Sequence, residues 1–284
     1  MKLVLGRDDL AEAAVNAIGT QAERLDIRPV HKAARGMIAE SSVDICELPI
    51  VTLLQAVAHD RPVLLLPVVA LGRPQHQTLV TCGELTVENV EGRSVGVRSW
   101  SQTTGVWMRG FLAEQYGVDL RKVDWVVYEG AHVAEQRDPF WVRRAPSGCR
   151  LQSDFLDRSL DFAIMGNELP VDERIRTAIP EAAQVAAAWS KEKGFAPVNH
   201  VVAVSEKAAR KHSADVCAAY DAMRELVAAE LAGFEALRGP VTQVASYALE
   251  QGALPRLVEF DELVARSCEA LGVSPDRFET EADR

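Results

Sequence analysis

Residues 94–117 read SVGVRSWSQTTGVWMRGFLAEQYG, a stretch that joins a strand pattern to a helix pattern through a polar turn. Small and apolar residues from Ser94 to Arg98 predict a strand, and apolar residues at helical spacing predict a helix over Ser101–Tyr116. Gly117 predicts the end of that helix, because glycine readily takes the left-handed conformation that closes helices. Strand, turn and helix in this order form the repeating unit of an α/β protein.

The same alternation continues on both sides of this unit. Strand patterns are expected at Leu3–Gly6, Val43–Leu48, Pro62–Val69, Val123–Tyr128, Leu160–Met165 and Val198–Val204. Helices are expected at Ile50–His59, Asp154–Arg158, Ala214–Gly233 and Leu257–Leu271. The unbroken apolar run Pro62–Val69 is typical of a strand buried on both faces. The sequence therefore predicts the α/β class, with mostly parallel sheets flanked by helices.

Charge and composition narrow the class of function. The 284 residues include 31 basic and 41 acidic ones, for a net charge of −10, and they contain no basic run. This balance gives no electrostatic reason to bind nucleic acid or an anionic membrane surface. No stretch approaches the ~18 apolar residues of a membrane span. Nucleic acid and membrane are therefore not expected as partners, and the sequence is compatible with a homo-oligomer without deciding it.

The cysteines and the N-terminus bear on the compartment. Five cysteines are scattered along the chain without a CxxC spacing, and the first residues lack the apolar core of a signal peptide. Free thiols and a cytoplasmic location are expected, because disulfides form mainly in oxidising compartments.

Polar residues follow several predicted strands. In open α/β sheets ligands bind beyond the carboxyl ends of the strands, so these residues are the first site candidates. They are Arg7, Glu47, Arg73, His76, Ser99, Ser101, Gln102, Thr103, Thr104 and Gly166, with Asn199 and His200 at the start of a later strand. The chain shows no metal-ligand spacing and no glycine-rich nucleotide loop, so neither a metal nor another cofactor is expected.

The polar turn before the helix offers one kind of chemistry. Backbone N–H groups at a helix start and the hydroxyls of Ser101–Thr104 could bind a carboxylate or a phosphate. The alternative is a simple serine or threonine helix cap without any ligand. Arg109 lies on the predicted helix after this turn, and it is expected to form a surface salt bridge or a salt bridge between elements.

Two histidines and one glutamate could transfer protons. His76 and His200 titrate near neutral pH in their unperturbed state, and Glu47 ends an apolar strand, where it could act as a base. The alternatives are an exposed loop histidine for His76, a hydrogen-bonded strand-end histidine for His200, and a helix cap for Glu47.

The segments Val106–Leu112 (VWMRGFL) and Glu114–Val118 (EQYGV) resemble a helix of the 4,5-dihydroxyphthalate decarboxylase-like family. Weaker similarities occur at Asp44–Leu48, Asn199–Val202 and Ser246–Gly252, so the resemblance spans nearly the whole chain. It implies a two-lobed, type II periplasmic-binding-protein-like fold. Residues 1–82 and 197–284 would form lobe one and residues 83–196 lobe two, with two hinge crossings and a ligand in the interlobe cleft.

The resemblance also implies a function. It points to a cofactor-independent decarboxylase, a carbon–carbon lyase of aromatic compound degradation that acts on a hydroxylated aromatic acid. In that case Ser101–Thr104 would hold the substrate carboxylate, His76 or His200 would donate a proton, and Glu47 would accept a hydrogen bond from the ring hydroxyl. The alternative is a non-catalytic cytoplasmic binding protein or sensor for a small organic acid, because one fold can host both functions.

Overall fold

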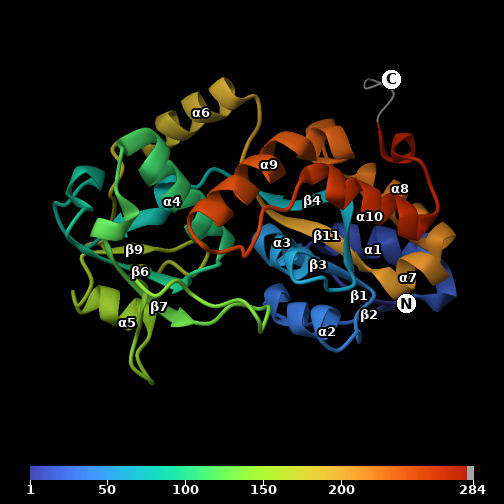
Figure 1. Cartoon of the computed structure of the whole chain (residues 1–284), viewed down its shortest axis with the longest axis horizontal. Helices are drawn as coiled ribbons and strands as arrows, with labels where there is room; N and C mark the ends of the chain where they lie inside the picture. The colour runs from blue at the N-terminus through green and yellow to red at the C-terminus, as the bar shows by residue number, and fades with distance from the viewer. Residues whose placement is uncertain (280–284) are drawn as a thin grey trace. The chain divides into compact units, whose positions relative to one another are not determined.

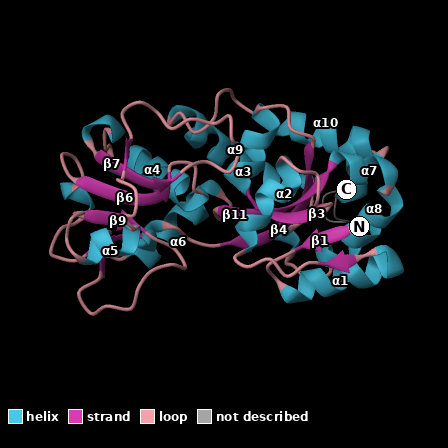
Figure 2. Cartoon of the chain, turned by 90° about the horizontal axis from the view of Figure 1, so that it is seen from below, coloured by secondary structure: helices cyan, strands magenta, loops and turns pink. Residues whose placement is uncertain are grey.

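The computed structural model describes residues 1–279, and the chain divides into two compact units (Figure 1). Within the described residues, unit 1 comprises Met1–Gly72, Val198–Ala245 and residues 256–279. Unit 2 comprises Arg73–Pro197 and Ser246–Pro255. Each unit is built on its own sheet, with helices packed around the strands (Figure 2).

Unit 1 contains a five-stranded mixed sheet in the order β2-β1-β3-β11-β4. Strand β1 pairs in parallel with β2 and β3, and β11 runs antiparallel between β3 and β4. The start of β11 therefore lies at the same edge of the sheet as the carboxyl ends of β1 and β3. The strands are β1 (Lys2–Val4), β2 (Glu23–Arg24), β3 (Ile45–Pro49), β4 (Val63–Gly72) and β11 (Val198–Ser205).

Helices cover this sheet and explain its apolar strands. The first eight residues of β4 are buried, because α3, α8 and α10 all contact this strand. A strand covered by helices has no polar face, so its sequence does not alternate. The helices of the unit are α1 (Asp8–Ile18), α2 (Ala34–Ile38), α3 (Ile50–Ala58), α7 (Glu206–Lys211), α8 (Ser213–Arg224), α10 (Phe260–Leu271) and the part of α9 (Phe234–Glu250) up to Ala245.

Unit 2 contains a six-stranded sheet in the order β10-β5-β9-β6-β7-β8. Strands β9, β6, β7 and β8 are parallel, whereas β5 and β10 are antiparallel to their neighbours. The strands are β5 (Leu79–Thr81), β6 (Ser94–Ser99), β7 (Asp124–Glu129), β8 (Arg143–Arg144), β9 (Phe162–Ile164) and β10 (Arg176–Thr177).

The helices of unit 2 are α4 (Thr103–Tyr116), α5 (Leu151–Leu156) and α6 (Ala182–Lys193). An aromatic cluster packs along α4, where the ring of Phe111 lies 4.9 Å from that of Trp189. Gly110 allows the close approach of Tyr247, since a Cβ atom at Gly110 would lie 2.2 Å from its ring. All five tryptophans of the chain lie in unit 2, so tryptophan fluorescence reports on this unit alone.

The predicted α/β class is confirmed, and each predicted strand is present with shifted ends. The helix expected over Ala214–Gly233 instead ends at Arg224, and Gly233 takes a φ of +98° before α9 begins. Helices α1, α2, α6, α7 and α9 had no counterpart among the predicted elements. None of the helices within residues 1–279 is long and apolar enough to cross a membrane.

The unit boundaries differ from the expected lobes in two places. Residues 73–82 lie in unit 2, because β5 pairs with β9 and β10 there. Ser246–Pro255 also packs in unit 2, where Gln251 makes two hydrogen bonds. The Gln251 backbone carbonyl accepts a hydrogen bond from Trp100 Nε1 at 2.9 Å, and the Gln251 side-chain amide donates to the Val106 carbonyl at 2.9 Å.

Candidate functional site

A buried glutamate and a histidine meet at the carboxyl edge of the unit 1 sheet. Glu47 lies on β3 and His200 on β11, and Glu47 Oε1 is 2.6 Å from His200 Nδ1. Their side chains are 6% and 20% exposed. An ionised carboxylate only accepts hydrogen bonds, so Nδ1 carries the proton of this contact. His200 Nε2 makes no hydrogen bond within residues 1–279, so this nitrogen is available to contact a ligand.

Positive and donating groups surround the Glu47 carboxylate. Its second oxygen, Oε2, accepts a hydrogen bond from the Gly6 backbone N–H at 2.7 Å. Burial acts to raise the pKa of Glu47, but the His200 contact, the Gly6 N–H and the charge of Arg28 outweigh it, and the pKa is lowered. Glu47 is therefore ionised at neutral pH. Arg7 lies beside Gly6 and pairs with Asp9, which makes the surroundings of the carboxylate polar on this side.

The other two predicted residues of unit 1 flank this pair. Asn199 precedes His200 on β11 and is buried. Arg7 lies in the turn between β1 and α1, where its guanidinium also donates to the Leu226 carbonyl at 3.3 Å. The structure thus brings Arg7, Glu47, Asn199 and His200 to one edge of the unit 1 sheet.

The remaining predicted residues lie in unit 2, around the turn from β6 to α4. Ser99, Ser101, Thr103 and Thr104 are all buried. The residue that caps α4 is Gln102, whose side chain makes no capping hydrogen bond. The simple helix-cap interpretation therefore does not describe this turn. The first N–H groups of α4 and four hydroxyls are gathered in one short segment, a composition suited to an anion.

A second group of polar side chains lies near this turn. Gln102 Nε2 donates to Glu168 Oε1 at 3.1 Å, and the Arg73 guanidinium donates to Asn167. Gly166 makes room for Arg73, because a Cβ atom there would lie 2.3 Å from Arg73 Nη2. Arg73 and Gly166, predicted separately from different strand ends, are thus in contact.

Comparison with curated proteins finds one informative relative. A stretch of 185 residues is 24% identical to 4,5-dihydroxyphthalate decarboxylase of Comamonas testosteroni. The resemblance to the 4,5-dihydroxyphthalate decarboxylase-like family is confirmed. The matched region covers 60% of this chain and 56% of the relative, so the match spans little more than half the length of that protein.

Solved structures with similar chain traces include sulfonate-binding proteins, and no family model matches the chain. The periplasmic aliphatic sulphonate binding protein SsuA of Escherichia coli is 11% identical, with 98% of this chain and 80% of that one covered and a TM-score of 0.46. SsuA of Methylobacillus flagellatus KT is 9% identical, with 96% and 94% covered and a TM-score of 0.49. Likenesses at this level carry no argument about the ligand. The predicted architecture of two α/β units, each with a sheet flanked by helices, is confirmed.

The family resemblance implies His76 or His200 as the proton donor, and the two histidines lie in different surroundings. His76 lies in a short turn, His76–Thr78, and is fully buried. Its ring stacks on Phe111 at 4.1 Å, and its Nε2 lies 2.9 Å from Gln115 Oε1. Burial lowers the pKa of His76, and the Gln115 contact opposes this only in part. His76 is therefore not the exposed loop histidine that the sequence suggested, and a neutral core histidine is a poor acid.

The burial of His76 predicts a pH dependence of stability. Its pKa in the folded protein lies below the 6.5 of a free imidazole, so below pH 6.5 the unfolded chain takes up a proton that the folded protein does not. The stability of unit 2 should therefore fall as the pH drops below 6.5, by at most about 1.4 kcal/mol per pH unit, and level off below the folded-state pKa. Urea unfolding followed by tryptophan fluorescence measures this slope. The His76→Leu variant should have a shallower slope, and identical slopes would contradict the burial argument.

Arg109 is not in the salt bridge that the sequence predicted. Its side chain is fully buried, and no carboxylate of the described residues forms an ion pair with it. Its Nε donates to Gln251 Oε1 at 2.8 Å, a second nitrogen donates to the Trp100 carbonyl, and its Cζ lies 3.6 Å from the centre of the Trp100 ring. Burial lowers the pKa of Arg109 well below its usual value. Its position indicates a structural role within unit 2.

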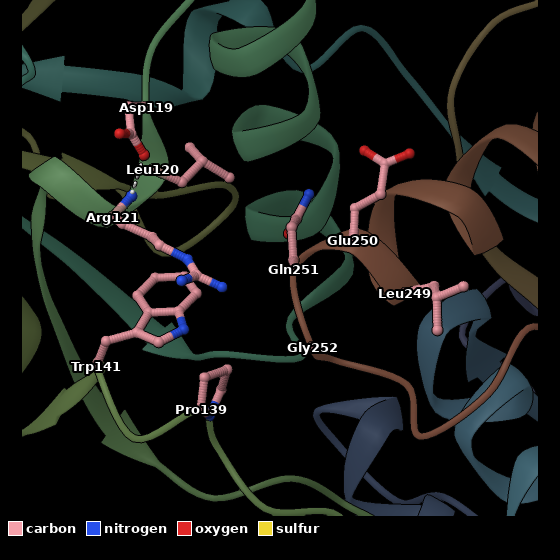
Figure 3. A pocket seen from close by; sticks show the side chains of 9 residues that line it. All are labelled: Asp119, Leu120, Arg121, Pro139, Trp141, Leu249, Glu250, Gln251 and Gly252. Atoms are coloured by element: carbon pink, nitrogen blue, oxygen red, sulfur yellow. Dashed lines mark hydrogen bonds between the residues drawn. The ribbon is translucent and has the colours of Figure 1, made fainter.

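A cavity of about 320 Å³ opens beside the segment that Arg109 holds (Figure 3). Gln251 and Gly252 line one side, and Arg121, Pro139 and Trp141 are among the residues that line the rest. The residues lining this cavity include none of the predicted site residues of the decarboxylase-like family. The cavity is therefore not part of the candidate site.

Sequence reasoning missed two neighbours of Glu47. Gly6 was assigned only as the end of a strand, and Arg28 was not considered. A glycine directly after the first strand was the one available signal for Gly6, and nothing local indicates Arg28. Among the described residues, no group of three or more histidine, cysteine, aspartate or glutamate side chains could hold a metal ion. The functional roles of the candidate residues stay predictions.

Proposed function

We propose that the chain is a cytoplasmic decarboxylase of a hydroxylated aromatic carboxylic acid, with His200 as the proton donor. The observation that carries this proposal is the pair of Glu47 and His200 at 2.6 Å in a relative of 4,5-dihydroxyphthalate decarboxylase. A buried carboxylate on Nδ1 orients the ring and offsets the charge of the imidazolium that donates from Nε2. The five free cysteines support a reducing compartment.

The proposed reaction replaces a ring carboxylate by hydrogen. His200 Nε2–H donates its proton to the ring carbon that carries the carboxylate, while a ring hydroxyl releases electron density into the ring. The carbon–carbon bond then breaks, CO2 leaves, and the bonding electron pair restores the aromatic ring. Solvent returns a proton to His200, so the net reaction consumes one proton and needs no oxidant or reductant.

Glu47 takes a different part from the one expected. Both of its oxygens are already engaged, Oε1 with His200 and Oε2 with the Gly6 N–H. Its main task in this proposal is therefore to hold His200, rather than to accept the ring hydroxyl.

In unit 2 we propose that the start of α4 binds an anion. Ser101 is a buried hydroxyl residue just before the cap residue Gln102, and Thr104 is a buried hydroxyl residue in the first turn of α4. The positive end of the helix dipole at this turn favours a carboxylate. Loss of a benzoate-induced thermal shift in Ser101→Ala would support this role, and an unchanged shift would remove it.

Turnover of candidate acids in D2O tests the decarboxylase proposal. The chain is incubated with 4,5-dihydroxyphthalate and with a panel of hydroxylated benzoates, and both CO2 and the aromatic product are analysed. We expect CO2 release and one deuterium on the ring carbon that carried the carboxylate. The imidazole proton exchanges with D2O, so the group that is donated is a deuteron. A thermal shift without CO2 from any acid would contradict the proposal and favour a binding protein or sensor.

A further inference from the structure

The turn between β1 and α1 lies directly against the Glu47 carboxylate. The Gly6 N–H donates to Glu47 Oε2 at 2.7 Å. A Cβ atom at Gly6 would lie 2.7 Å from the same oxygen and 3.2 Å from the carboxylate carbon. Real Cβ atoms essentially never lie within 3.0 Å of another heavy atom, so any side chain at this position would require the carboxylate to move. Gly6 is needed here for close approach to Glu47.

Arg28 holds the other side of Gly6. Its Nη1 donates to the Gly6 carbonyl oxygen at 2.7 Å. Its Nε donates to Asp26 and its Nη2 to Asp8, both at 3.0 Å, so the guanidinium is oriented by two carboxylates. The Arg28 side chain is 48% exposed, which means that it adds little to the core. The hydrogen bond from Arg28 to Gly6 thus fixes the turn and does not contribute to core packing.

We infer that Gly6, held by Arg28, is a positioning residue that orients Glu47 and thereby sets the tautomer of His200. With Oε2 tied to the Gly6 N–H and Oε1 on Nδ1, the carboxylate cannot rotate away from the imidazole. The neutral ring then keeps its proton on Nδ1 and leaves Nε2 to the ligand. The catalytic part of this inference rests on the proposed function, whereas the tautomer does not.

Imidazole 15N NMR of the full chain tests the inference directly. The His200 signals are identified as those absent from His200→Gln. We expect one neutral tautomer, with the proton on Nδ1, in the wild type and a mixture of both tautomers in Gly6→Ala. Gly83→Ala is the matched control, because a Cβ atom at Gly83 meets nothing within 4 Å. Arg28→Gln should move the tautomer ratio in the same direction by a smaller amount.

Steady-state kinetics add the functional readout. Misplacing a catalytic group by about 1 Å can cost about 100-fold, so kcat of Gly6→Ala should fall by that order while KM changes less. An unchanged tautomer in Gly6→Ala overturns the inference, whatever the activity. A shifted tautomer in a chain whose wild type releases no CO2 supports the inference and overturns the proposed function. If Gly6→Ala does not fold, Arg28→Gln decides by the same readout, because its side chain is half exposed.

Discussion

Replacing Arg109 by alanine is expected to lower the free energy of unfolding of unit 2 by about 3–5 kcal/mol. The substitution removes a fully buried side chain, and it takes away the donors that satisfy the Trp100 carbonyl and Gln251 Oε1. Each unpaired buried acceptor costs about 1–3 kcal/mol, and the cavity adds to this. Release from burying an unpaired charge offsets part of the loss. Gln251 would also lose a contact that ties Ser246–Pro255 to the unit.

Urea unfolding followed by tryptophan fluorescence measures this effect. The probe is local, since Trp100 and Trp125 lie 3.6 Å and 5.6 Å from the guanidinium carbon. Arg109→Met should lose less, because the methionine chain fills much of the volume. Arg121→Ala, an exposed arginine of the same unit, is the control and should stay within about 0.5 kcal/mol of the wild type. An Arg109→Ala variant as stable as that control would show that the guanidinium does not hold unit 2 together.

Replacing His200 by glutamine is expected to lower kcat for decarboxylation by about 10²–10⁴-fold, the usual contribution of a general acid. The substitution removes the group that donates the proton, and it leaves Glu47 with a weaker, neutral partner. Glu47→Gln should lower kcat as well, because an amide no longer offsets the charge of the imidazolium. The proton transfer can be followed as deuterium incorporation into the product in D2O.

The chain offers a matched control for this variant. His212 and Asp215 form a second histidine–carboxylate pair in unit 1, with 3.6 Å between Nδ1 and Oδ2. His212→Gln should retain the wild-type kcat, because this pair lies at the start of α8 and has no part in the proposal. Wild-type kcat in His200→Gln, with the fold verified by circular dichroism, would assign the proton transfer to another group.

The sequence identified the candidate residues individually, but it did not show which of them lie close together. Glu47 and the Ser101–Thr104 turn were identified because in α/β proteins polar residues after strands mark the ligand edge of a sheet, and His200 was identified at the start of a later strand. Residue type alone could not rank His76 against His200. The ranking depends on burial against Phe111 and Gln115 in one case and on a carboxylate partner in the other.

The sequence by itself determined the local elements and the fold class. The unit from β6 to α4, with Gly117 in the left-handed conformation at the helix end, follows from hydrophobic spacing and glycine chemistry within a few residues. The continuous apolar run of β4 likewise predicted a buried strand.

Only the tertiary structure decided which distant residues meet. Glu47 and His200 are separated by 153 positions, and Arg109 and Gln251 by 142, so no local pattern relates them. The tertiary structure also buries Arg109 and His76, which local sequence patterns did not predict. The physical reason is that helix and strand patterns record which face of an element is apolar. The partner of a polar side chain depends on how the sheets are ordered and paired.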